Sequence, residues 1–371
     1  MFCKAPFSSL CVTGDKFSVC CQHPFLDDEY DFNSANFKAL RNELTNFVDK
    51  PSSKFERCVK CAINHSYEEF SVNSDNHLDN LFNLSPSNEI ADHKISFFHI
   101  VFGNKCVCAC KTCNSLNSSL YSKLYDGINN LVSVTPNYRK VIIEQAENLN
   151  YVTVIGGETF LYKEELEFLL EHLKLGTKLH LYTNAMVFDK ELITKLMEKF
   201  EVKLQISIDG YGKNLEYVRV GTKSDVVFEN AKQIIQLPMT SCIIYTTSVL
   251  NCFNMFDEIS YIMETLNNHL IINVVVEPEL YSVVHLPEYL KDKIREQIKL
   301  VKEKFVNTEK VSNINALEYV LDSKSKYSEM EAKELLKKDI LHKDKSADFD
   351  TLDRLEKNIK EYLFGGDDNV L

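Results

Sequence analysis

The chain has 371 residues, is 44% hydrophobic and carries a formal net charge of −12. This length suffices for two or three domains with a substantial core, and the acidic charge disfavours a general nucleic-acid binder because it repels phosphates. No apolar run reaches the roughly 18 residues of a membrane span, and the N-terminus lacks the basic and apolar segments of a secretory signal.

The first 90 residues are irregular in pattern and rich in cysteine. Ser9–Cys21 predicts a β-hairpin, because apolar residues alternate on both sides of the turn pair Gly14-Asp15. Phe37–Val48 has the apolar spacing of a helix and ends before Pro51. Ten of the twelve cysteines precede residue 114. Clustered cysteines in an intracellular chain bind metal more often than they form disulfides.

Between about residue 94 and residue 277, strand-like and helix-like segments alternate. The predicted strands are Ile95–Phe102, Tyr151–Ile155, Lys178–Tyr182, Lys203–Ile208, Cys242–Val249 and Leu270–Val276. The predicted helices between them include Lys163–Leu175, Asp189–Phe200, Val226–Leu237 and Met255–Asn268. Six successive β/α units predict a parallel sheet with right-handed crossovers, whose working residues follow the carboxyl ends of the strands.

From Leu286 onward the sequence is helical and heavily charged. Ser328 to Glu331 forms a capping box for a helix through Ile340. Asp350 is the expected cap of a last helix with an apolar stripe at Leu352, Leu355, Ile359 and Leu363. We expect these helices to pack against the rest of the protein.

Cysteines follow the first predicted strand of the alternating region. Cys106, Cys110 and Cys113 have the spacing C-x3-C-x2-C. Three thiolates on one short loop can hold three irons of a [4Fe–4S] cube and leave the fourth iron open to a small molecule. The same spacing also fits half of a zinc site. Cys108 is an extra thiol in this loop, and we favour a buried packing role for it.

Polar or glycine-rich motifs follow the next strands. Gly156-Gly157-Glu158 follows the second, where the glycines allow close backbone approach and the carboxylate can accept from an ammonium group. Thr183-Asn184 follows the third. Ser207 and Asp209 end the fourth and could bind ribose hydroxyls, and Arg219 comes shortly afterwards. Each motif alone is weak, but their order predicts one shared rim of a β/α barrel.

With these motifs the sequence resembles the radical S-adenosylmethionine (SAM) superfamily. The resemblance implies an α/β fold, a partial (β/α)6 TIM-like barrel with an N-terminal cysteine-rich segment and C-terminal helices. It implies a SAM-cleaving [4Fe–4S] cluster on the cysteine loop. It also implies a SAM site whose residues include Gly156, Gly157, Glu158, Thr183, Asn184, Ser207, Asp209 and Arg219. The expected chemistry is one-electron cleavage of SAM to methionine and a 5′-deoxyadenosyl radical, which takes hydrogen from a substrate.

A second cysteine set lies near the N-terminus. Cys58-x2-Cys61 together with Cys3 and either Cys20 or Cys21 provides four thiolates for zinc or a second [4Fe–4S] cluster. This arrangement is similar to the SPASM/twitch type of auxiliary-cluster motif. Segments similar to that branch continue at Ser207–Thr222, Glu277–Pro287 and Asp348–Leu355. We expect Cys11, Cys242 and Cys252 to be packed.

The resemblance predicts three regions and a broad function. Residues 1–90 would form the auxiliary iron–sulfur segment, 91–280 the radical SAM partial barrel, and 281–371 a helical region. The enzyme would oxidise or modify a peptide, a protein or a small carbohydrate in the cytoplasm, away from membranes. An electron donor such as flavodoxin or ferredoxin would be its partner. The alternatives are a non-catalytic zinc-binding module and a radical SAM enzyme that modifies a nucleic acid, which the acidic charge disfavours.

Overall fold

The computed structural model describes residues 9–13, 16–18, 95–132, 137–305, 308, 310–350 and 354–365. The chain forms two compact units. The first comprises Met1–Gly103, Val132–Tyr182 and Asp189–Leu204, and the second comprises Asn104–Leu131, Thr183–Phe188 and Gln205–Leu371. Each unit therefore draws on separate stretches of sequence, and strand β7 (Glu201–Ser207) passes from the first to the second.

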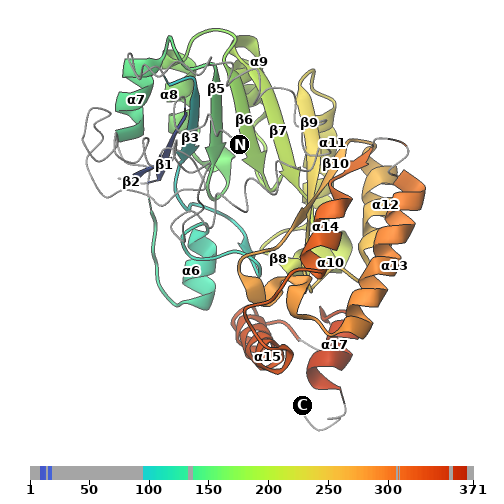
Figure 1. The fold of residues 1–371 in the computed structure, drawn as a ribbon. Helices are drawn as coiled ribbons and strands as arrows, with labels where there is room; N and C mark the ends of the chain where they lie inside the picture. The colour runs from blue at the N-terminus through green and yellow to red at the C-terminus, as the bar shows by residue number, and fades with distance from the viewer. Residues whose placement is uncertain are drawn as a thin grey trace, which may run out of the picture. The chain divides into compact units, whose positions relative to one another are not determined.

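The first unit is a sheet covered by helices, in which the strand order is β7, β6, β5, β3, β1, β2 (Figure 1). Its other strands are β1 (Ser9–Thr13), β2 (Lys16–Ser18), β3 (Phe97–Val101), β5 (Tyr151–Ile155) and β6 (Lys178–Thr183). The pairs β1–β3, β3–β5 and β5–β6 are parallel, whereas β1–β2 is an antiparallel hairpin. Helices α7 (Asn137–Gln145), α8 (Lys163–His172) and α9 (Lys190–Lys199), with the short 3-10 turn η3 (Thr159–Leu161), connect the strands.

The alternation of side chains across this sheet explains its core. Phe98, Val152 and Leu179 stand opposite one another in register and are fully buried. Because successive side chains point to opposite faces, the intervening residues form a polar row on the other face. That row holds His99, Thr153 and His180. One face of the sheet is thus an apolar surface, and the other face carries this polar row.

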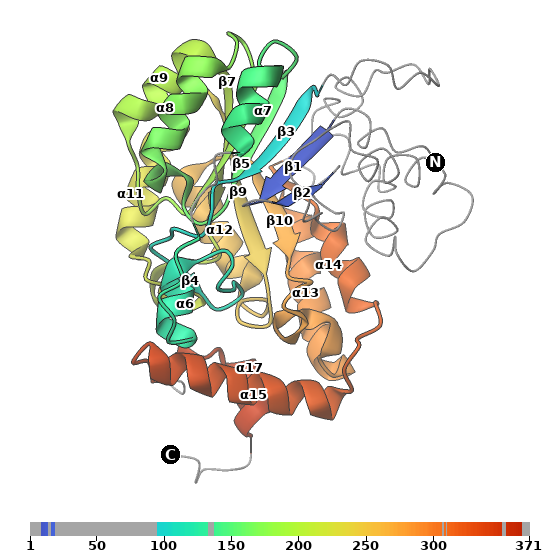
Figure 2. The ribbon, with the colours of Figure 1, turned by 90° about the vertical axis from the view of Figure 1, so that its left-hand side faces the viewer.

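The second unit continues with β9 (Thr240–Thr247), β10 (Leu270–Val274) and β11 (Val311–Ser312), which are parallel neighbours. A separate two-stranded ladder joins β4 (Ala109–Cys110) to β8 (Arg219–Val220) in antiparallel fashion. The helices are α6 (Ser119–Tyr125), α10 (Gly212–Val218), α11 (Ser224–Ile235), α12 (Met255–Leu266), α13 (Glu288–Phe305), α14 (Ile314–Leu321), α15 (Glu329–Ser346) and α17 (Lys357–Phe364). Two 3-10 turns, η4 (Glu279–Tyr281) and η5 (Val283–His285), lie between β10 and α13. Figure 2 shows α15 beside α6 in this unit.

The α/β class predicted from the sequence is confirmed, and all six predicted strands are present. The strand–helix alternation is consistent with a partial (β/α) barrel. The hairpin predicted in Ser9–Cys21 is also confirmed by the pairing of β1 with β2. The proposed helix at Phe37–Val48 lies outside the described residues. The division into three regions, 1–90, 91–280 and 281–371, stays a prediction. Among the described residues, no helix has the length and apolar character needed to span a membrane.

Two details of the C-terminal helices differ from expectation. Ser328 caps α15 as predicted, with its hydroxyl accepting from the backbone N of Glu331 at 3.3 Å, but the helix continues past Ile340 to Ser346. The prediction that Asp350 caps the last helix is wrong. That helix begins at Lys357, and the Glu356 carboxylate caps it by accepting from two backbone N–H groups.

Candidate functional site

The cysteine loop, residues 103–113, follows β3 and is fixed in position by Asn104. This side chain is fully buried, and its Nδ2 donates to the carbonyls of Ser115 at 2.9 Å and Asn130 at 2.8 Å. The Asn104 carbonyl in turn accepts from the backbone N of Ser119 at 2.6 Å. A buried side-chain amide that donates to two segments, next to a backbone carbonyl that accepts from a third residue, fixes these segments relative to one another. Sequence reasoning missed Asn104, because an asparagine beside a glycine predicts only a turn.

The thiols of the loop lie close enough to influence one another. Cys108 is buried, as expected, and hydrogen bonds with the side chains of Cys106 and Cys110 raise its pKa above the ordinary value. The same bond from Cys108, opposed by burial and aided by Arg219, lowers the pKa of Cys110 to about 7. Burial, together with the charge of Cys110, raises the pKa of Cys113 to about 12. Of these three thiols, Cys110 is therefore the one that most readily becomes the thiolate that metals bind.

The donor set of the loop consists of thiols, the ligand type that binds iron–sulfur clusters and also zinc. In the described part of the chain, no three or more His, Cys, Asp or Glu side chains are arranged to hold one metal ion. Cys106, Cys110 and Cys113 are all partly exposed on one loop, which suits ligation of an iron–sulfur cluster.

Arg219 is attached to the cysteine loop through the β4–β8 ladder. Its backbone pairs with that of Cys110, and the backbone N of Lys111 donates to the Val218 carbonyl at 2.9 Å. The Arg219 guanidinium contacts the Asp209 carboxylate at 2.6 Å. Burial disfavours the cation, but the charges of Cys110 and Asp209 outweigh it and hold the pKa of Arg219 well above its usual range. A fixed positive charge thus lies beside a cysteine of the loop.

Asp209 already has partners for both carboxylate oxygens. One oxygen accepts from Arg219, and the other accepts from the backbone N of Thr246 at 2.7 Å, which links the end of β7 to β9. Asp209 is buried, whereas Ser207 at the end of β7 is half-buried. The geometry gives Asp209 a positioning role, and ribose binding by Ser207 and Asp209 stays a prediction.

Asn184 also reaches the cysteine loop. Its Nδ2 donates to the Sγ of Cys106 at 3.7 Å, while its Oδ1 accepts from the backbone N of Met186 at 2.9 Å. The preceding Thr183 accepts from the backbone N of Ala185 at 3.0 Å. The segment after β6 therefore turns sharply and places an amide donor on a cysteine sulfur. Such N–H···S bonds tune the reduction potential of iron–sulfur clusters.

The Gly156-Gly157-Glu158 motif belongs to the first unit and follows β5. Gly156 and Gly157 have positive φ values of 105° and 40°. A Cβ atom on Gly156 would lie 2.5 Å from the Gly103 carbonyl oxygen, so a side chain cannot be accommodated. Glu158 is fully buried, and its carboxylate caps η3 by accepting from the backbone N of Phe160 at 3.2 Å. A buried carboxylate at a strand end suits recognition of a cation, and its role toward SAM stays a prediction.

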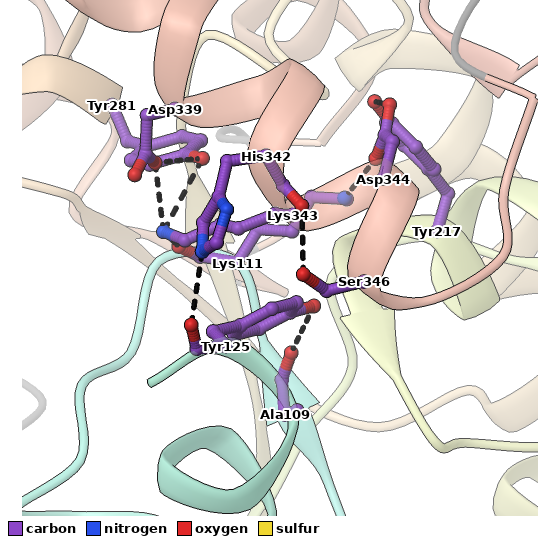
Figure 3. Close-up of polar contacts among 10 residues, drawn as sticks. All are labelled: Ala109, Lys111, Tyr125, Tyr217, Tyr281, Asp339, His342, Lys343, Asp344 and Ser346. Atoms are coloured by element: carbon purple, nitrogen blue, oxygen red, sulfur yellow. Dashed lines mark hydrogen bonds and ion pairs between the residues drawn. The ribbon is translucent and has the colours of Figure 1, made fainter. Parts of the chain in front are cut away.

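Lys111, between two of the loop cysteines, is a functional candidate that the sequence reasoning missed. The side chain is fully buried, and its ammonium forms an ion pair with Asp344 of α15 (Figure 3). The position of this lysine between two cysteines was visible in the sequence, but its burial was not. A buried lysine needs a counter-charge. Nothing in the sequence pointed to Asp344 as that partner.

The remaining cysteines divide into two groups. Cys3, Cys20, Cys21, Cys58 and Cys61, the predicted auxiliary ligands, lie outside the described residues. Cys11, Cys242 and Cys252 are buried, as expected for packed side chains.

One protein family matches part of the chain. Residues 100–259 match the family described as the Radical SAM superfamily. No curated protein matches the chain. Similar solved structures include native anSMEcpe with bound AdoMet, at 19% identity and a TM-score of 0.46, covering 58% of this chain and 64% of that chain. Another is Streptococcus suis SuiB bound to precursor peptide SuiA, at 14% identity and a TM-score of 0.44, covering 78% and 67%. This chain thus spans less than two thirds of the first of these structures.

The family match begins within β3 and ends within α12, so it includes the cysteine loop and all of the strand-end motifs. Over residues 100–259 the chain is therefore similar to the radical SAM superfamily.

Proposed function

We propose that Cys106, Cys110 and Cys113 hold a [4Fe–4S] cluster at which SAM is reductively cleaved, and that the product radical takes hydrogen from a peptide, a protein or a small carbohydrate. The observation that carries this proposal is the family match over a loop whose three thiols interact within one unit. When bound, the cluster and SAM supply a one-electron cleavage that protein side chains cannot perform themselves.

Several side chains in and around the cysteine loop support this proposal. Cys110, with its lowered pKa, offers a thiolate for ligation near neutral pH. Arg219 provides a positive charge beside the loop, and Asp209 holds Arg219 in place. Asn184 donates to the Cys106 sulfur. Gly156, Gly157 and Glu158 supply a close backbone approach and a buried carboxylate, which suit the amino group of SAM.

The N-terminal cysteines form the second part of the proposal. Cys3, Cys58 and Cys61, with one of Cys20 and Cys21, would hold an auxiliary [4Fe–4S] cluster, as in proteins with a SPASM/twitch motif. The electron for SAM cleavage would come from a donor such as flavodoxin or ferredoxin. An enzyme with two such clusters requires a reducing compartment, which fits a cytoplasmic location.

Metal analysis followed by a SAM-cleavage assay tests the proposal. The protein is purified without oxygen, its iron, sulfide and zinc are measured, and it is incubated with dithionite and SAM. About eight irons per chain and formation of 5′-deoxyadenosine are expected for two [4Fe–4S] clusters. About four irons with the same product would support the SAM-cleaving cluster and contradict the auxiliary cluster. Zinc alone with no 5′-deoxyadenosine would refute the proposal in favour of a zinc-binding module.

A further inference from the structure

The cysteine loop contains a buried positive charge that no part of the proposed chemistry uses. The Lys111 side chain is fully buried, and so is its partner Asp344. Removing a charge from water costs several kcal/mol per ion, so an ammonium stays in such a place only when a counter-charge holds it. Asp344 lies 233 residues further along the chain, on α15. The loop therefore depends on a distant helix for the burial of one of its own residues.

Helix α15 contacts the backbone of Lys111 as well as its side chain. The ammonium of Lys343 donates to the Lys111 carbonyl at 2.8 Å. Lys343 is itself paired with Asp339 at 2.8 Å, and the Tyr281 hydroxyl donates to the same Asp339 carboxylate at 2.7 Å. Two lysines and two aspartates thus balance their charges around this loop (Figure 3).

Aromatic side chains complete the arrangement. The Tyr217 hydroxyl donates to Asp344 Oδ2 at 3.0 Å, and the Lys111 ammonium lies 4.4 Å from the centre of the Tyr217 ring. A desolvated ammonium over an aromatic face gains further electrostatic stabilisation. Tyr217 belongs to α10, directly before β8, so the ion pair also contacts the segment that pairs with Cys110.

On the other side of Cys110, Tyr125 provides a second connection. Its hydroxyl donates to the Ala109 carbonyl at 3.1 Å, and its own carbonyl contacts His342 Nε2 at 2.9 Å. Helix α15 thus acts on the residue before Cys110 through Tyr125 and on the residue after Cys110 directly. The middle cysteine of the loop has fixed neighbours on both sides.

We propose that α15 is part of the cluster site, with Asp344 and Lys343 as positioning residues that hold Lys111 and thereby keep Cys110 and Cys113 in place for iron. This inference rests on the proposed function, since it assigns the C-terminal helix a role in loading the cluster of that site. As positioning residues, they would act through Lys111 and would not themselves bind iron or substrate. Their effect is on the order of the loop, which can be measured without iron.

Hydrogen exchange of the iron-free, full-length protein is the direct test. The variants are Lys111→Met, Asp344→Asn and the double variant Lys111→Met/Asp344→Leu, with Lys338→Met as the control from the exposed face of the same helix. Each single variant should speed exchange of the 106–113 amides at least tenfold and leave β9 and β10 unchanged. Iron bound after anaerobic reconstitution should fall several-fold. Because the double variant has no unpaired buried charge, it should be less damaged than either single variant.

Tyr217→Phe provides a milder test, in case the stronger variants fail to fold. It removes only the hydroxyl that donates to Asp344, and a smaller acceleration confined to the same loop is expected. Unchanged loop exchange and iron binding in the two single variants would overturn the proposal, and so would equal acceleration throughout the second unit. If the wild-type chain bound no iron, the proposed function would fail, whereas loop exchange would still report whether α15 orders the loop.

Discussion

Arg219 stands opposite Cys110 in the β4–β8 ladder, and its guanidinium is held by the Asp209 carboxylate at 2.6 Å. Two segments about 100 residues apart in sequence are thereby joined by backbone and by charge. Asp209 and Arg219, which follow the fourth predicted strand, therefore support the cysteine loop at Cys110. The position of this cysteine depends on them as well as on the loop itself.

Replacement of Cys110 by alanine should remove the SAM-cleaving cluster. One of three proposed ligands is lost, so iron should fall to about half of the wild-type value and 5′-deoxyadenosine should not form. Cys108→Ala is the matched control, because Cys108 is a buried thiol of the same loop that we do not assign as a ligand. Iron and sulfide analysis of both variants measures the difference. Equal iron loss in the two would show that Cys108 is also a ligand.

Replacement of Glu158 by glutamine should weaken SAM binding while the clusters still form. A hydrogen bond to a charged group contributes about 1.5–3 kcal/mol, which corresponds to roughly 10- to 100-fold in Kd. Equilibrium binding of SAM to the reconstituted protein measures this. Glu164→Gln, an exposed residue in the first turn of α8, is the control and should bind SAM normally. Unchanged affinity in Glu158→Gln would mean that the SAM amino group lies elsewhere.

The stability of the protein should depend on the protonation of Glu258. Burial raises the pKa of this carboxyl from 4.5 to about 8, although Tyr245 and Asn214 donate to it. The folded protein keeps a proton that the unfolded chain releases above about pH 4.5, so this contribution to stability is lost as pH rises towards 8. The loss should approach about 1.4 kcal/mol per pH unit. Denaturant unfolding of Glu258→Gln should show a flatter pH dependence between pH 5 and 8, and an identical slope would contradict the assignment.

The Asn184 donor should influence the reduction potential of the proposed cluster. Asn184→Asp keeps an acceptor for the Met186 backbone but replaces the N–H group facing Cys106 with a negative charge. Loss of the N–H donor and gain of a negative charge both disfavour an added electron on the cluster. The reduction potential should therefore become more negative. A redox titration followed by electron paramagnetic resonance measures it. Asn230→Asp, which loses a bond to the Ala185 carbonyl rather than to sulfur, should shift the potential less. A similar shift in both variants would argue against a specific bond to Cys106.

Replacement of Cys58 by alanine should remove the auxiliary cluster alone. Iron should fall by about half, and dithionite-driven SAM cleavage should continue, because the ligands of the SAM-cleaving cluster are intact. Iron content and 5′-deoxyadenosine yield are measured on the same preparation. Loss of both clusters would instead indicate that the N-terminal site is needed for folding.

The regular elements could be predicted because their side-chain periods are clear. Tyr151–Ile155 has the predicted bounds, since its buried residues stand between flanking polar segments. The capping box at Ser328 was also recognisable, because the capping interaction is local in sequence. The start of α17 was not, since Asp350 and Glu356 are both acidic residues ahead of an apolar stripe, and local pattern cannot choose between them.

The candidate site was predictable as a set of strand ends but not as a set of contacts. Asp209, Arg219 and Asn184 were selected as groups for SAM, whereas the structure engages them with one another, with backbone and with a cysteine sulfur. Such partnerships depend on how segments meet in space, which spacing along the chain does not encode. Asn104 and Lys111 escaped notice for the same reason.

The ion pair between Lys111 and Asp344 also sets an order for assembly in the cell. The two residues are separated by 233 positions, which at the usual pace of translation corresponds to about 10–50 s. During most of that interval the cysteines of the loop have been synthesised, but the helix proposed to order them has not. Iron delivery to this loop is therefore expected to be a post-translational event, completed after α15 has folded against it.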